Sequence, residues 1–110
     1  MMKKRFKITE ETTYDELLNY LEELYHFPNK IIDLKIIRKI CQRIGAEEVK
    51  ATGSSVRFYH RALEMHPYYK GYFQVHKKHK GGTKQEISRT DFRKYLYGPL
   101  KEIINFMKTN

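Results

Sequence analysis

Two short segments in the second half of the chain alternate between apolar and polar residues. The first reads VRFYH (56–60) and the second reads YFQVH (72–76). A period of two residues, built from β-branched and aromatic side chains, is typical of strands that bury one face. The pattern therefore predicts two strands of a sheet that has one apolar face and one face of polar and aromatic groups.

The polar face of these strands would gather side chains that suit nucleic acid. Arg57 and Tyr59 would come from the first strand, and Tyr72 and His76 from the second. Tyrosine rings and guanidinium planes on an open sheet can stack unpaired bases. Tyrosine is also common on half-exposed strands, so an ordinary solvated face is the alternative. His60 falls on the apolar face and is expected at the edge of the core.

Two helices are predicted before the strands. A capping box that begins at Thr13 introduces a helix over about 14–25. A second helix is expected between Asp33, as its N-cap, and Gly45, as its C-cap. The apolar stripe of the second helix includes Cys41, which is therefore expected to be buried rather than to act as a nucleophile.

Strand and helix signals continue on both sides of the alternating segments. Residues 47–52 read as a further short strand, and residues 77–86 as a basic loop with a glycine pair. A last helix should begin near Ser88 or Thr90, break at Gly98-Pro99 and resume toward the end of the chain. We therefore predict an α+β fold with helices packed on one face of a three-stranded antiparallel sheet. The single domain would consist of a helical extension, a core and an added C-terminal helix, over residues 1–30, 33–97 and 99–110.

The distribution of charge points to a polyanionic partner. Residues 1–30 hold 5 basic and 6 acidic side chains, a net of −1, whereas residues 31–110 hold 17 basic and 7 acidic side chains, a net of +10. A compact basic domain most often binds nucleic acid.

The basic N-terminus lacks an apolar stretch behind it, and no segment approaches the ~20 apolar residues of a membrane span. We expect a cytoplasmic protein with no membrane contact.

The stretch VHKKHKGG (75–82) is the strongest candidate for chemistry. It places His76 and His79 among lysines at the end of a strand. Imidazoles titrate near neutrality and can move protons to and from the oxygens of RNA. A solvated basic loop is the alternative. No cysteine or carboxylate cluster accompanies the two histidines, so no metal site is predicted.

Three segments together resemble the HicA toxin family over about residues 33–97. DLKIIRKICQRIGAEEV (33–49) is similar to the opening helix, glycine and first strand of that family. GSSVRFY (53–59) resembles its turn and second strand. VHKKHKGG, followed by EISRTDFRKYL (86–96), resembles its histidine-containing third strand, loop and closing helix. The resemblance implies a fold like that of double-stranded-RNA-binding domains.

HicA toxins are mRNA interferases, so the resemblance implies RNA as substrate, no cofactor and a HicB-type antitoxin that covers the site. The catalytic histidine of the family follows Gly-Ser in the turn, whereas Ser55 stands at that position here. A serine hydroxyl cannot replace imidazole as a general base, because its pKa lies far above neutrality. The catalytic prediction therefore moves to His79, assisted by His76. The predicted RNA contacts are Ser55, Arg57, Tyr59, Tyr72, Lys77, Lys78, Lys80 and Lys84.

Two other functions fit the same residues. The loss of the turn histidine favours a non-catalytic RNA-binding module. A protein-interaction domain whose basic surface meets an acidic partner is the third possibility, and the added helices could then form the interface or a homodimer contact.

Overall fold

The protein is described from a computed structural model that covers residues 7–79 and 85–110, with the side chain of His79 excepted. Its central sheet consists of β2 (Glu47–Val49), β3 (Ser55–Tyr59) and β4 (Tyr72–His76), paired antiparallel in that order. The apolar residues of β3 and β4 are buried, and the residues between them are half-buried or exposed. The predicted alternation is confirmed, because both strands bury every second side chain under the helices.

Two helices begin and end as their caps predict. In α1 (Tyr14–Tyr25), the Thr13 side chain accepts from the backbone N–H of Glu16, and the Glu16 side chain accepts from the N–H of Thr13. Asp33 caps α2 (Leu34–Ile44) by accepting from the N–H of Lys35. Gly45 ends α2 with φ at 81°, a left-handed conformation that glycine adopts without steric cost.

The last helix runs through Gly98-Pro99, so the predicted break there is wrong. The helical backbone continues over α3 (Arg89–Asp91), the π-helical η2 (Phe92–Leu96) and α4 (Tyr97–Thr109). Within η2 the N–H of Tyr97 reaches back five residues to the carbonyl of Phe92. This wider turn moves the preceding carbonyl groups away from the position where a proline ring would clash with them. Pro99 also has no backbone N–H to pair, and it is tolerated in the first turn of α4.

Both ends of the predicted loop over residues 77–86 lie in strands of a second sheet. This sheet contains β1 (Ile31–Asp33), β6 (Gln85–Ser88) and β5 (Lys78–His79), paired antiparallel in that order. Fully buried Ile32 lies opposite fully buried Ile87, which fixes the register of β1 and β6. The strands are too short to show a period of two, and β1 pairs with β6 more than fifty residues later in the chain.

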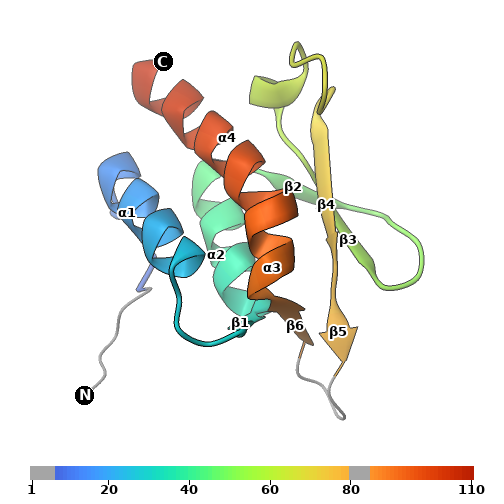
Figure 1. Ribbon diagram of the computed structural model, residues 1–110. Coiled ribbons are helices and arrows are strands. Elements are labelled where there is room, and N and C mark those ends of the chain that lie inside the picture. The colour runs from blue at the N-terminus through green and yellow to red at the C-terminus, as the bar shows by residue number, and fades with distance from the viewer. Residues whose placement is uncertain (1–6, 80–84) are drawn as a thin grey trace.

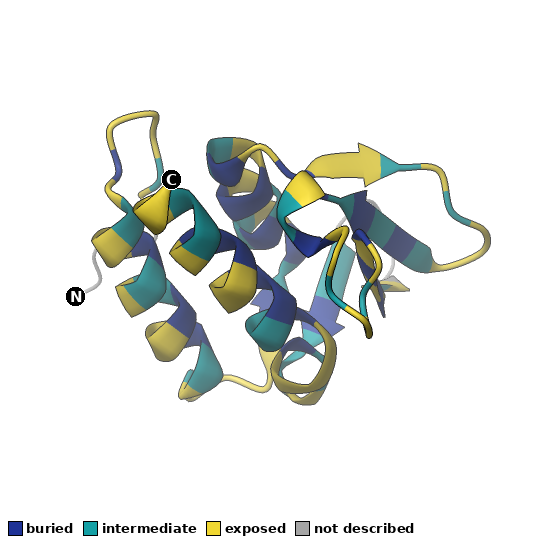
Figure 2. Cartoon of the chain, turned by 90° about the horizontal axis from the view of Figure 1, so that it is seen from above, coloured by how far each residue is buried: buried dark blue, intermediate teal, exposed yellow. Residues whose placement is uncertain are grey.

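The helices form one layer on the inner face of the central sheet, as predicted (Figure 1). Figure 2 shows the buried residues concentrated between the helices and toward the sheet. Helix α1 belongs to this core, because Leu17, Leu21 and Leu24 are at most 1% exposed. Leu100, Ile103 and Ile104 of α4 are fully buried as well, so the apolar sides of both added helices are covered within this chain. Among the described residues, no helix is long and apolar enough to cross a membrane.

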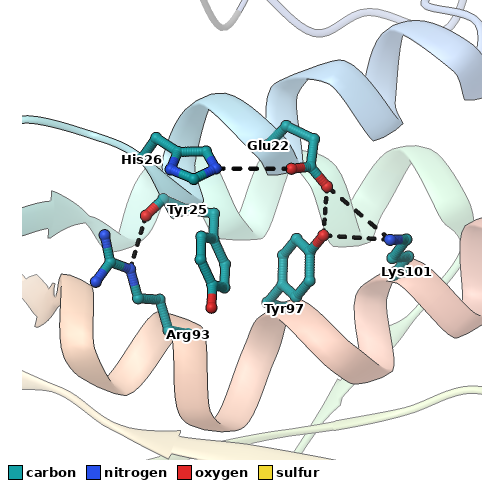
Figure 3. A network of polar contacts seen from close by, with 6 residues as sticks. All are labelled: Glu22, Tyr25, His26, Arg93, Tyr97 and Lys101. Atoms are coloured by element: carbon teal, nitrogen blue, oxygen red, sulfur yellow. Dashed lines mark hydrogen bonds and ion pairs between the residues drawn. The ribbon is translucent and has the colours of Figure 1, made fainter.

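Polar contacts join α1 to the closing helices (Figure 3). Tyr97 donates a hydrogen bond to the Glu22 carboxylate, which raises the pKa of Tyr97, and Lys101 donates to the Tyr97 oxygen at 3.2 Å. Arg93 donates through Nε to the carbonyl of Tyr25 at 2.7 Å. These contacts hold the N-terminal helix at a fixed position on the side of the molecule away from the outer sheet face.

A buried cysteine and a bridging arginine complete the frame. Cys41 is 2% exposed within α2, and burial raises the pKa of its thiol, so it cannot supply a thiolate at neutral pH.

Arg38 of the same helix donates to Glu48 of β2 at 3.0 Å and to Gln85 of β6 at 2.8 Å. Arg38 thereby ties the two sheets to one helix.

Candidate nucleic-acid interface

The outer face of the central sheet carries a double row of polar and aromatic side chains. Three of the five cross-strand pairs between β3 and β4 lie on this face, and in Figure 1 the helices lie on the opposite side of the sheet. The β4 members are exposed and the β3 members are half-buried. The predicted sharing of one face by the aromatic, arginine and histidine side chains is confirmed. The pairs are Ser55 with His76, Arg57 with Gln74, and Tyr59 with Tyr72.

Flat groups stack at one end of this face. The guanidinium carbon of Arg57 lies 4.2 Å from the centroid of the Tyr72 ring, a cation–π contact. The Tyr72 and Tyr59 rings lie 5.3 Å apart with planes tilted by 55°. The Tyr59 hydroxyl donates to the carboxylate of Glu64, which holds the ring in place. The cluster leaves Tyr72 40% exposed and available to a further flat group.

Ser55 and His76 meet at the other end of the face. The Oγ of Ser55 lies 3.3 Å from Nδ1 of His76, within hydrogen-bond distance. Because His76 is exposed, its second ring nitrogen, Nε2, would be accessible to a ligand. Ser55 at the start of β3 is therefore adjacent in space to an imidazole on the next strand. The sequence does not reveal this neighbourhood, because it depends on the register between β3 and β4.

Basic side chains and carboxylates lie at both ends of the face. Lys77 and Lys78 follow His76 directly, and the N–H of Lys77 donates to the carbonyl of Ser54 at 2.9 Å, which extends the ladder. At the tyrosine end, Glu47 of β2 lies opposite Tyr59, whose hydroxyl also contacts a carboxylate. Arg57 stands beside these rings, and Lys78 at the other end lies opposite Glu86 of β6, so a polyanionic backbone would find basic groups at both ends.

Several predicted residues lie outside the part of the chain that the structure describes. Lys80 and Lys84 belong to this group, and His79 is described only by its backbone, which pairs with Gln85 in β5. Within the described residues, no group of three or more histidine, cysteine, aspartate or glutamate side chains is placed to hold a metal ion.

His60 lies at the core, as predicted. It is 4% exposed, its Nε2 lies 3.0 Å from the carbonyl oxygen of Ile44, and its Nδ1 accepts from the N–H of Ala62 at 2.9 Å. These partners select the neutral tautomer with the proton on Nε2, and burial lowers the pKa of the ring. His60 is a structural residue and plays no part in the outer face.

Tyr68 and Tyr95 border this face at the edge of β4 and were not among the predicted contacts. They are 80% and 42% exposed. In the sequence, Tyr68 belongs to the aromatic pair after Pro67, and Tyr95 falls with Phe92 and Leu96 on the predicted apolar side of the last helix. Comparisons with protein-family models, curated proteins and solved structures find no match to this chain. The functional argument therefore rests on the residues described above.

Proposed function

We propose that this protein binds RNA on the outer face of its central sheet. The main support is the row in which Arg57 and Tyr72 stack at 4.2 Å and Ser55 and His76 pair at 3.3 Å, on a face that the helices do not cover. Open sheets that combine aromatic rings with basic residues are a recurrent solution for unpaired nucleotides. The net charge of +10 over residues 31–110 agrees with a polyanionic ligand.

In this proposal, bases and phosphates contact different parts of the face. Bases would stack on the Tyr72 ring beside Arg57, and the exposed amide of Gln74 would lie between the rings and the histidine, able to bond base edges. Phosphates would lie toward Lys77 and Lys78. The resemblance to HicA toxins adds a HicB-type antitoxin that covers the same face, which would block RNA by occupying these side chains.

Binding of a labelled single-stranded oligoribonucleotide should weaken steeply as salt rises. Each neutralised phosphate of a single strand contributes about −0.7 to the slope of log K against log salt, so three cationic contacts give a slope of about −2 or steeper. Fluorescence anisotropy at several salt concentrations measures this slope. A flat plot, or no binding even at low salt, would contradict the proposal and favour a protein partner.

The same site can support RNA cleavage of the interferase type. His76, with Nδ1 beside Ser55, can accept the proton of a ribose 2′-hydroxyl through Nε2. The 2′-oxygen then attacks the adjacent phosphorus, the bond to the 5′-oxygen breaks, and a protonated group returns a proton to that oxygen. The products are a 2′,3′-cyclic phosphate and a 5′-hydroxyl. We propose His79 and His76 as the acid–base pair.

Replacing His76 and His79 together by alanine should lower any cleavage of single-stranded RNA by about 10²- to 10⁴-fold, the usual contribution of general acid–base groups. His26→Ala is the matched control, because its imidazole is 71% exposed at the end of α1, in the helix layer. Gel analysis of a labelled RNA measures the rate. Cleavage that survives the double substitution would remove the assignment, and binding without cleavage by the unmodified protein would identify the non-catalytic module.

A further inference from the structure

A groove rich in tyrosine runs beside β4, on the side away from β3. Its volume is about 430 Å³, within the ~300–1,000 Å³ of typical ligand sites. Tyrosines from three separate segments line it: the turn before β4, β4 itself and the π-helical η2. Four of the nine tyrosines of the chain gather here, which is too strong a concentration to treat as scattered surface residues. They are Tyr68, Tyr69, Tyr72 and Tyr95.

The turn that carries two of these rings is held rigidly. The Nδ1 atom of His66 accepts from the N–H of Tyr68 at 3.1 Å, and the N–H of Tyr72 donates to the carbonyl of Tyr69 at 3.1 Å. The Tyr68 and Tyr69 rings meet edge to face at 5.1 Å. Helix α4 presses against the same turn at Gly98, where an added Cβ would lie 2.9 Å from the Tyr69 hydroxyl. These contacts hold the turn that forms one wall of the groove.

The groove is continuous with the outer sheet face. Tyr72 and Gln74 belong to both, so a strand lying on the sheet face can place its next nucleotide in the groove. Among the described residues that line the groove, Lys94 carries the only full charge, and its Nζ lies 5.7 Å from the Tyr95 ring. Aromatic walls with one cation fit a base and its phosphate, and they offer nothing to attract a basic peptide.

We propose that this tyrosine groove binds an unpaired base of a single-stranded RNA whose preceding phosphates lie on the outer sheet face. The inference rests on the proposed function and extends it from a charged surface to a site that requires bases. A paired base would already be stacked and bonded within its duplex, so the groove would select unpaired segments.

The test compares an oligouridine with inorganic polyphosphate, which has the charge but no bases. Tyr68→Ala with Tyr95→Ala should weaken oligouridine binding by about 5- to 150-fold, the loss of stacking on one base, and leave polyphosphate binding unchanged. Tyr68→Phe with Tyr95→Phe keeps the rings and should keep the affinity. Since the chain has no tryptophan, its tyrosine fluorescence should be quenched by oligouridine, and less so in the alanine variant.

The outcomes separate this inference from the proposed function. If Arg57→Ala weakens oligouridine binding but the tyrosine-to-alanine variant does not, the sheet face stands and the groove is wrong. Equal losses for oligouridine and polyphosphate in the tyrosine-to-alanine variant would also overturn the groove, because base stacking would not be the cause. If the unmodified protein binds no oligouridine at low salt, both proposals fail.

Discussion

Replacing Arg57, Lys77 and Lys78 together by alanine is expected to weaken binding of single-stranded RNA roughly 50-fold at about 0.15 M salt. Three lost phosphate contacts make the slope of log K against log salt shallower by about 2, and that change gives this factor at 0.15 M. The loss of Arg57 also removes the cation that stacks on the Tyr72 ring at 4.2 Å. Anisotropy titrations of a labelled oligouridine at several salt concentrations measure both quantities.

A control variant separates the site from net charge. Lys35, Lys39 and Lys108 are exposed on α2 and α4, in the helix layer, and their replacement by alanine removes the same charge. This variant should keep most of the affinity, because screening limits the reach of a surface charge to about 8 Å at physiological salt. Equal losses in the two triple variants would show that binding follows overall charge and would argue against the sheet face as the site.

Replacement of His60 by alanine should lower the free energy of unfolding by about 2–5 kcal/mol. The imidazole pairs with the Ile44 carbonyl and the Ala62 N–H, and each buried group left without a partner costs about 1–3 kcal/mol. Such a loss is a large part of the ~5–15 kcal/mol that stabilises an ordinary domain. Urea denaturation followed by circular dichroism measures it, with His76→Ala as a control for an exposed imidazole.

The same residue should make the fold sensitive to mild acid. Burial lowers the pKa of His60 below its ordinary 6.5, so the unfolded chain takes up a proton first as pH falls. The contribution of His60 is therefore fully present above about pH 6.5 and is lost as pH falls through the lowered pKa of the folded state. Denaturation at pH 7.5 and 5.5 should show a smaller difference in His60→Ala than in the unmodified protein. An unchanged difference would assign the acid sensitivity to other groups.

Features that depend on near neighbours in the chain are predictable from the residues alone. The Thr13–Glu16 capping box and the Asp33 cap follow from side chains within three residues of the groups they satisfy. The Gly45 cap follows from the ability of glycine to adopt a positive φ. The faces of β3 and β4 follow from alternation, since successive side chains of a strand point to opposite sides. Even the buried place of His60 follows from its position in that alternation.

Features that depend on distant partners escaped prediction. The strands β5 and β6 form because β6 finds β1, more than fifty residues earlier, where Ile32 and Ile87 pack together. The helix passes through Gly98-Pro99 because the π-helical η2 accommodates the proline, and a π-helical turn has no clear sequence signature.

The fold class, the caps of α1 and α2 and the outward-facing side chains of β3 and β4 are predictable from the residues alone, because they depend on local periodicity and capping. The pairing of Ser55 with His76 and the groove that tyrosines from three segments line beside β4 depend instead on tertiary contacts. The connection between β3 and β4 runs over residues 60–71, too long for a tight turn to fix the register. The register is set by burial of the apolar face against the helices, and with it the chemistry of the outer face.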